Sequence, residues 1–360
     1  MNAGGAETFL MKLYRRLDRA EYQMDFCVNV PEKNYYEDEI AALGGRMFRI
    51  PPRSAGIAAH DRALRDLIRK EGYRYVLAVS SSATAYLDLR TAKRAGAALC
   101  SVRSSNSNLG MSAASKCRHL LLRGCFQRWA DRLIAPSDLA AIHMFGRHYD
   151  RDPRFFYLRN ALAYEDFRFS PADRARIRAE LSLPADCLTV GHVGRFYRQK
   201  NHSFLLEVFA ALLRSAPEAR LLLVGAGELE PAIREQAAAL GLTERVIFAG
   251  VRADVSALLS AMDVFVFPSF FEGMPNTVIE AQASGLPCVV ADTVTREADV
   301  TGLVEYLPLG DARQWAQAAI AAVRPERPDT RQAFREHQYD ISRAVEQFVQ
   351  IVFGETNGNQ

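Results

Sequence analysis

Two glutamates, Glu272 and Glu280, flank the most informative stretch of the sequence. The apolar run at residues 264–269 has the pattern of a buried strand, and Pro275 with Asn276 is typical of the start of a helix. The two carboxylates therefore flank a strand-to-helix turn at the carboxyl end of a strand. Ligands bind at that end of open α/β sheets, and a helix N-terminus there favours an anion such as a diphosphate.

Each of these carboxylates also has an ordinary structural explanation. A glutamate in the first turn of a helix complements the helix macrodipole without any ligand. A Glu-Gly pair such as Glu272 with Gly273 is common in turns. From these residues alone, the ligand-binding interpretation and the structural interpretation both stand.

A second candidate segment follows the first strand expected in the second half of the chain. Arg195 and Lys200 leave the end of this strand together, so both side chains can reach an anion held over the loop. Arginine offers a planar fork of donors for phosphate, and lysine offers a compact point charge. A solvated basic loop is the alternative for an isolated pair with this spacing.

Strand-like and helix-like segments alternate along the chain, which is typical of parallel sheets with right-handed crossovers. We therefore expect an α/β protein with two doubly wound, Rossmann-like domains. They cover residues 1–165 and 187–335, with a linker at 166–186 and a C-terminal helix and tail at 336–360. The expected strands are residues 22–30, 47–50, 75–80, 98–102, 132–135, 155–158, 188–194, 220–225, 245–250, 264–268 and 287–291.

Composition and charge exclude several classes of protein. With 360 residues, 49% hydrophobic and 24% charged, the chain suits two globular domains and not a disordered or fibrous class. The 45 basic residues nearly balance the 42 acidic ones, so a nucleic-acid partner is not expected. The six scattered cysteines indicate a reducing cytosol and no zinc site. No signal peptide or membrane-spanning run is expected, so we predict a cytoplasmic protein.

The turn with the two glutamates resembles the Glu-x7-Glu signature of glycosyltransferase family 4. The match includes Phe-Glu-Gly-Met-Pro-Asn at 271–276 and Glu-Ala-Gln-Ala-Ser-Gly-Leu-Pro at 280–287. The basic segment at 194–201 is similar to the Gly-Arg…Lys-Asn motif of the same family. The resemblance covers nearly the whole chain and is strongest at 188–292. It implies the GT-B fold, in which a cleft separates two Rossmann-like domains and the C-terminal helix crosses back to the N-terminal domain.

The resemblance also implies a role for each candidate in the second domain. Arg195 and Lys200 hold the donor diphosphate and stabilise the charge that develops as the sugar leaves. Glu272 contacts the donor sugar, Glu280 accepts the ribose hydroxyls, and the loop at 250–252 touches the nucleobase. Glu272, Arg195 and Lys200 are thus the predicted catalytic residues. The further donor-binding candidates are Gly194, Gly225, Val251, Arg252, Gly273, Met274, Pro275, Asn276 and Thr277.

In the first domain, Gly4 and Gly5 open a helix where backbone N–H groups can closely approach phosphate or sugar. A tight turn is the alternative. In the family, a strand precedes this glycine loop. That strand is absent here, so we expect either a start further upstream or a sheet that lacks one strand. Many relatives carry a histidine-containing segment after a later strand, and Arg103 and Asn106 are the candidate contacts in its place.

The resemblance implies a retaining, hexosyltransferase-type glycosyltransferase without a metal or other cofactor. The donor is a nucleotide-diphosphate sugar, with a UDP-sugar favoured, and the acceptor is a glycan or a lipid-linked sugar. The amino-acid sequences of residues 4–8 and 14–19 resemble those of exopolysaccharide or capsule enzymes. The basic segment at 116–132 suits peripheral contact with an anionic membrane, or else is a plain surface helix. A catalytically inactive scaffold subunit and a GT-B nucleotide-sugar epimerase are the functional alternatives.

Overall fold

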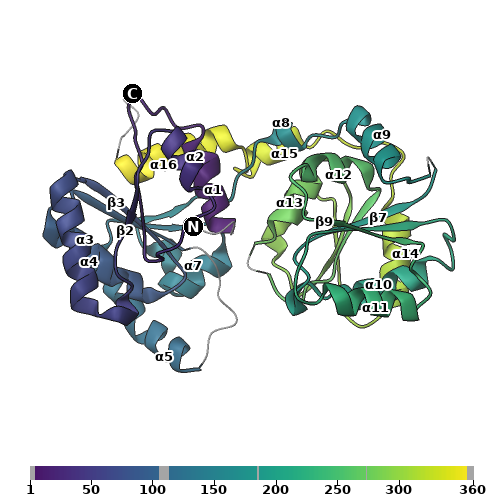
Figure 1. Cartoon of the computed structure of the whole chain (residues 1–360), viewed down its shortest axis with the longest axis horizontal. Coiled ribbons are helices and arrows are strands. Elements are labelled where there is room, and N and C mark those ends of the chain that lie inside the picture. Colours follow the sequence, from purple (N-terminus) through teal and green to yellow (C-terminus); the bar gives the residue numbers. More distant parts are fainter. Residues whose placement is uncertain (1–4, 105–112, 185, 273, 355–360) are drawn as a thin grey trace. The chain divides into compact units, whose positions relative to one another are not determined.

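The computed structural model describes residues 5–104, 113–184, 186–272 and 274–354. The chain forms two compact units, which Figure 1 shows with their elements labelled. Met1–Leu162 and Gln338–Gln360 form the first unit, and Ala163–His337 form the second. Both units are α/β structures in which every paired strand is parallel to its neighbours.

The first unit contains two separate parallel sheets. One has the strand order β3-β4-β5-β6, and the other is the pair β1-β2. A cavity of about 550 Å³ is lined by residues of both β1 and β3. The strands are β1 (Phe26–Val28), β2 (Met47–Arg49), β3 (Tyr75–Ser80), β4 (Leu99–Ser104), β5 (Arg132–Ala135) and β6 (Phe155–Tyr157). The helices are α1 (Gly5–Tyr14), α2 (Glu37–Ala42), α3 (Ile57–Glu71), α4 (Tyr86–Ala95), α5 (Ala113–Leu122), α6 (Phe126–Trp129), α7 (Asp138–Phe145) and α16 (Ile341–Phe353).

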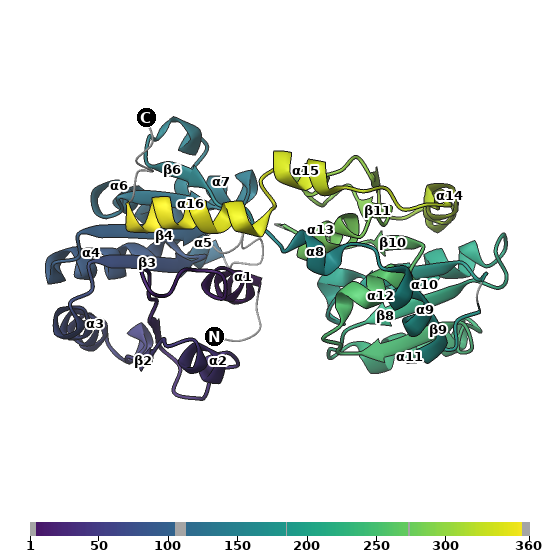
Figure 2. The same ribbon diagram turned by 90° about the horizontal axis from the view of Figure 1, so that it is seen from above.

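The C-terminal helix α16 packs on the first unit, against α1, β3 and β4. Figure 2 shows α16 in yellow, lying beside these strands. Its apolar face, which includes Phe348 and Val352, is buried. The ring of Phe353 lies 4.8 Å from that of Tyr22 and 5.3 Å from that of Tyr75. The expected return of the last helix to the N-terminal domain is therefore confirmed.

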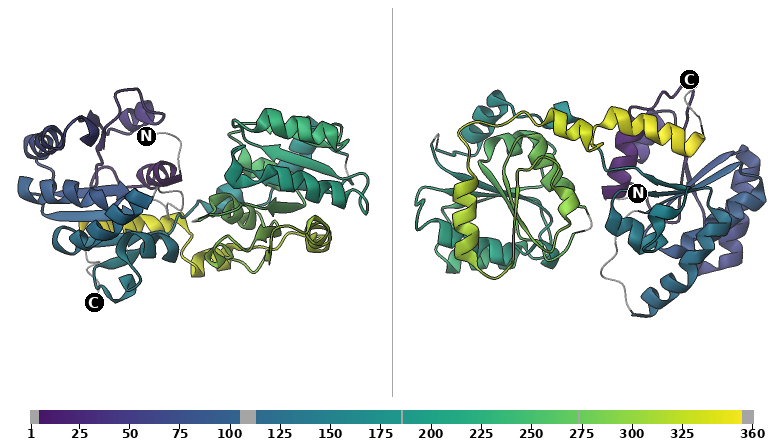
Figure 3. Two further views of the ribbon diagram at one scale, coloured as in Figure 1. Left: turned by 90° about the horizontal axis from the view of Figure 1, so that it is seen from below. Right: turned by 180° about the vertical axis from the view of Figure 1, so that it is seen from behind.

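The second unit is a single six-stranded sheet with the order β12-β11-β10-β7-β8-β9. Figure 3 shows in two further views that helices cover both faces of this sheet. The strands are β7 (Thr189–Val193), β8 (Arg220–Val224), β9 (Val246–Gly250), β10 (Val264–Phe267), β11 (Cys288–Ala291) and β12 (Val304–Leu307). The helices are α8 (Tyr164–Phe167), α9 (Pro171–Glu180), α10 (His202–Leu212), α11 (Glu230–Ala239), α12 (Val255–Ala261), α13 (Asn276–Ala283), α14 (Ala312–Ala322) and α15 (Arg331–Glu336).

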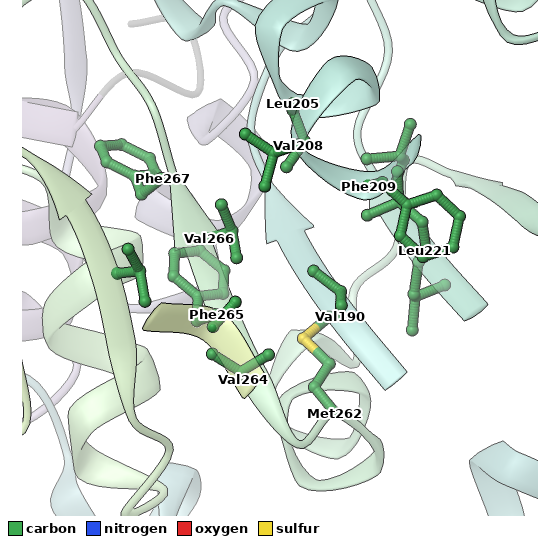
Figure 4. Close-up of a cluster of buried hydrophobic side chains, with 14 of the residues drawn as sticks. Val190, Leu205, Val208, Phe209, Leu221, Met262, Val264, Phe265, Val266 and Phe267 are labelled. Carbon is green, nitrogen blue, oxygen red and sulfur yellow. The ribbon is translucent and has the colours of Figure 1, made fainter. Parts of the chain in front are cut away.

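Strand β10 lies in the core of this sheet, and all four of its residues have no exposed surface. Figure 4 shows Phe265 and Phe267 of β10 among the apolar side chains of neighbouring elements, such as Val190 and Leu205. A strand that is covered on both faces requires a continuous apolar run instead of an alternating pattern. The continuous apolar run therefore identifies β10 in the sequence, and the end of the run marks the carboxyl end of the strand.

The segment expected as a linker, residues 166–186, belongs to the second unit. Its helix α9 is held there by arginines that contact a main-chain oxygen of α12 and the carboxylate that directly precedes β10. The Arg174 guanidinium lies 2.7 Å from Asp263 Oδ1, and the buried Arg178 donates to the carbonyl of Ala261 at 3.1 Å. The chain passes between the units at residues 162–163 and again at 337–338.

Candidate active site

The loops that follow β7 and β10 lie where the order of the sheet reverses. From β7 the chain builds outward through β8 and β9, and it then returns to place β10 on the other side of β7. Ligands of open α/β sheets bind outside the carboxyl ends of the strands at such a reversal. We call residues 194–200 after β7 the basic loop, and residues 269–272 after β10 the acidic loop.

The structure brings Lys200 of the basic loop and Glu272 of the acidic loop together. Lys200 Nζ lies 2.7 Å from Glu272 Oε1, and the two side chains are only 17% and 11% exposed. The same ammonium group lies 4.5 Å from the centre of the Phe267 ring. Two of the three predicted catalytic residues therefore form an ion pair at the carboxyl ends of neighbouring strands.

The third predicted catalytic residue, Arg195, is exposed at the start of the basic loop. Its guanidinium lies 4.8 Å from the centre of the Tyr197 ring, which holds the side chain by a cation–π contact. Within the described part of the chain, Arg195 forms no ion pair. Its charge is therefore available to an anion above the strand ends.

Hydrogen bonds join the loops after β7, β8 and β9 in series. Gly194 donates its backbone N–H to the Val224 carbonyl at 2.9 Å, and Gly225 donates to the Gly250 carbonyl at 2.8 Å. Gly225 has φ of +135°, and a Cβ atom on it would lie 2.2 Å from the carbonyl oxygen of Gly194. Only glycine at 225 allows this close approach, which places the predicted positions Gly194 and Gly225 side by side.

We expect Gly225→Ala to destabilise the second unit by about 2–4 kcal/mol, because it adds both backbone strain and a steric clash with Gly194. Urea unfolding of the full chain measures the effect. Gly241→Ala is the matched control, since Gly241 also has a positive φ but a Cβ there would meet nothing within 4 Å. Equal losses in the two variants would mean that the close approach at Gly225 contributes nothing.

Helix α13 begins at Asn276, four residues after Glu272, and carries three of the predicted donor-binding residues: Asn276, Thr277 and Glu280. Pro275 precedes the helix without a side-chain capping bond, and Met274 packs against the core. The buried Thr277 hydroxyl has no hydrogen-bond partner among the described residues. Glu280 is half-buried, one turn beyond Thr277 on the same face of the helix. The first turn of α13 therefore offers an uncapped N-terminus, with a carboxylate set one turn behind it.

The loop after β9 presents two predicted residues in different ways. Val251 is 80% exposed. The guanidinium of Arg252 lies 2.8 Å from an Asp254 oxygen and 2.6 Å from a Glu180 oxygen, and these bonds raise the pKa of Arg252 above its usual range. Because the Arg252 side chain is already paired, its contribution to a ligand at this loop would come through the backbone.

Two buried histidines lie beneath the basic loop. His192 of β7 donates from Nδ1 to the Val266 carbonyl at 2.9 Å, and the His202 ring stacks on Phe196 at 4.2 Å. Burial, reinforced by the nearby charge of Lys200, lowers the pKa of His202 to about 4 and holds the pKa of His192 well below 6.5. Both rings are therefore neutral at pH 7, and they add no charge next to Lys200.

The candidates in the first domain are placed differently. Gly4 and Asn106 lie outside the described residues, as does Gly273 of the second domain, and Gly5 is the first residue of α1. Arg103 is fully buried and donates to Asn160 Oδ1 at 2.6 Å, with its guanidinium over the Phe9 ring. Burial lowers the pKa of Arg103 to about 9. This residue is thus part of the core of the first unit, and its contact with a ligand stays a prediction.

Two features of the described residues bear on cofactors and membranes. No group of three or more His, Cys, Asp or Glu side chains among them is arranged to hold a metal ion. In the same part of the chain, no helix has the length and apolar character needed to span a membrane.

Comparison with known proteins agrees with these observations. The family model described as "Glycosyl transferases group 1" matches residues 187–324, and the one described as "Glycosyltransferase Family 4" matches residues 3–157. EpsF of Bacillus subtilis (strain 168), which is named as a glycosyltransferase, is 33% identical over 354 residues. That match covers 96% of this chain and 92% of EpsF. The fold and these matches define a glycosyltransferase.

Two further similarities concern the fold and part of the sequence. The crystal structure of Anabaena Alr3699/HepE in complex with UDP is 19% identical, with a TM-score of 0.78, and covers 98% of this chain and 97% of that one. A UDP-Gal:alpha-D-GlcNAc-diphosphoundecaprenol alpha-1,3-galactosyltransferase of Escherichia coli is 33% identical over 130 residues, which are 35% of this chain and 34% of that protein. The chain belongs to glycosyltransferase family 4, and its two α/β units have the GT-B fold.

Proposed function

We propose that this enzyme transfers a sugar, with retention of the anomeric configuration, from a UDP-sugar to a glycan or lipid-linked acceptor. The observation that carries the proposal is the meeting of Lys200 and Glu272, 2.7 Å apart, at the carboxyl ends of β7 and β10. A diphosphate that bears a sugar requires a cation for its phosphates and an acceptor group for the sugar hydroxyls. These two side chains supply both, side by side.

The donor site that we propose is built from the loops of the second unit. Arg195 and Lys200 bind the diphosphate, and the uncapped start of α13 adds backbone N–H groups and the positive end of the helix dipole. Glu272 binds the donor sugar and Glu280 binds the ribose hydroxyls. Solved structures of Anabaena HepE with UDP and with UDP-glucose have the same fold, which supports a uridine nucleotide as the donor.

The proposed transfer takes place on one face of the sugar. The bond between the anomeric carbon and the diphosphate oxygen breaks, and a bond to the acceptor hydroxyl oxygen forms on the same side. The hydroxyl proton passes to the leaving phosphate oxygen. Arg195 and Lys200 stabilise the negative charge that collects on this oxygen, so the chain's own cations can perform the task that a metal ion performs elsewhere.

For the acceptor, one relative supports a lipid-linked saccharide. The E. coli relative is named for a diphosphoundecaprenol-linked acceptor. We therefore propose an acceptor in exopolysaccharide assembly that is a glycan or a lipid-linked sugar.

A panel of nucleotides tests the donor site first. Thermal unfolding of the purified chain is measured with UDP, GDP, ADP and CMP, and with Arg195→Ala as the control. We expect selective stabilisation by UDP that is lost in the variant. Proton NMR of the product, made with a synthetic lipid-linked acceptor, then reports the anomeric configuration. Inversion would contradict the retaining mechanism, and formation of an epimer from the donor alone would instead identify an epimerase.

Contact with a membrane is a further part of the proposal, and it rests on α5. Leu120 is 56% exposed and Leu121 is 76% exposed, and the exposed Arg118 lies on the same short helix. Apolar side chains beside a basic one suit the surface of an anionic bilayer. We expect the double change Leu120→Ser and Leu121→Ser to weaken binding to phosphatidylglycerol vesicles about tenfold or more in a flotation assay.

The matched control for this prediction is Leu240→Ser. Leu240 is 42% exposed and lies directly after α11 in the second unit. Its replacement should leave vesicle binding unchanged. Equal binding by the wild-type protein and the Leu120/Leu121 double variant would rule out α5 as the contact.

A further inference from the structure

The acidic loop is not anchored by its own aromatic side chains. Phe270 is 42% exposed and Phe271 is 40% exposed, so neither ring is buried in the core. Burial of large apolar side chains is the usual way in which a loop is fixed to a sheet. The position of Glu272, the next residue along the chain, must therefore depend on polar contacts of this segment.

The basic loop supplies three of these polar contacts through two adjacent residues. The Gln199 carbonyl accepts the backbone N–H of Phe270 at 2.9 Å. The Gln199 side chain donates from Nε2 to the Phe271 carbonyl, also at 2.9 Å. Lys200 then pairs with Glu272 at 2.7 Å. Two successive residues of one loop thus bind three successive residues of the other.

The other side of the acidic loop is held by the segment after β11. Thr293 donates its hydroxyl to the Ser269 carbonyl at 2.9 Å, and Val294 forms an isolated parallel bridge with Glu272. Phe271 and Glu272 are therefore held from both directions. Gln199 provides the side-chain bond to the carbonyl that directly precedes Glu272.

We propose that Gln199 is a positioning residue that sets Glu272 against the donor sugar. The inference rests on the proposed function, because it assumes that Glu272 binds the sugar part of the donor. An amide suits this role because its N–H group donates to a carbonyl without adding charge beside a diphosphate site. Gln199 acts through Glu272 and touches no reacting atom.

The test compares the turnover of a UDP-sugar with the binding of UDP, which lacks the sugar. In Gln199→Met the side chain keeps its length and neutrality but cannot donate, while the backbone bond to Phe270 stays. We expect kcat/KM for the UDP-sugar to fall about tenfold to a hundredfold, because Glu272 is misplaced. The dissociation constant for UDP, which lacks the sugar, should stay within about threefold of the wild-type value.

Two controls separate positioning from a general loss of structure. Gln236→Met removes a similar bond, from Gln236 Nε2 to the Ser203 carbonyl at 3.2 Å, and should leave both ligands unaffected. In a Glu272→Gln background, Gln199→Met should cause little further loss, because the residue through which it acts has already been changed.

The outcomes distinguish this inference from the proposed function. Wild-type protein that binds neither UDP nor a UDP-sugar overturns both. Wild-type activity together with unchanged kcat/KM in Gln199→Met overturns the role of Gln199 alone. Equal weakening of UDP and UDP-sugar, or full additivity with Glu272→Gln, also overturns it.

Discussion

Arg195→Ala is expected to lower kcat/KM for the UDP-sugar by an amount that corresponds to about 2–4 kcal/mol of transition-state stabilisation. This is the usual effect of removing one preorganised charge from a developing anion. The change should not alter folding, because Arg195 is exposed and its described contact is with the Tyr197 ring. Steady-state kinetics and urea unfolding of the same preparation measure the two effects separately. The loss should appear in kcat as well as in KM, since the charge on the phosphate grows in the transition state.

Arg198→Ala is the matched control for this prediction. Arg198 is also exposed, lies in the same loop and carries the same charge. A general electrostatic attraction of the basic loop for nucleotides would make the two variants equally weak. A specific contact with the diphosphate requires that Arg195→Ala be much weaker than Arg198→Ala. Activity that survives Arg195→Ala at the wild-type level would remove this residue from the site.

The second domain could be predicted well from the sequence, because its strands are continuous apolar runs. The expected strand at 264–268 is found as β10, and the helix expected after Pro275 is found as α13. The turn between them, with Glu272 and Glu280 on its two sides, lies at the carboxyl end of β10 as predicted. Local pattern is sufficient here, since a buried strand and a helix start each have a signal within a few residues.

Features that depend on distant residues could not be predicted in this way. Gln199 meets Phe271 across 72 positions of the chain, and no spacing within the basic loop indicates that contact. The burial of Arg103 against Asn160, 57 positions away, has no local signal either. Strand β12 was not expected either, because it is four residues long at the edge of the sheet and is only partly buried. In each case tertiary packing decides the outcome.

When Lys200 and Glu272 are changed together, the free energy of unfolding should largely recover from the loss seen in Lys200→Met, whereas activity should stay lost. Lys200→Met leaves Glu272, whose side chain is 11% exposed, without its cation. We expect this variant to lose about 1–3 kcal/mol of unfolding free energy, the usual result of leaving a largely buried charge unpaired. Its kcat/KM should also fall by an amount that corresponds to about 2–4 kcal/mol of transition-state stabilisation, because the phosphate loses its cation.

Adding Glu272→Gln to Lys200→Met removes the unpaired charge, so most of the lost unfolding free energy should return. Activity should not return, because the double variant lacks both the cation for the diphosphate and the carboxylate for the sugar. Urea unfolding and steady-state kinetics of the two single variants and the double variant complete the cycle. A purely structural ion pair would give the opposite result, with activity restored along with stability. The double variant therefore separates a site that binds a donor from a salt bridge that only joins two loops.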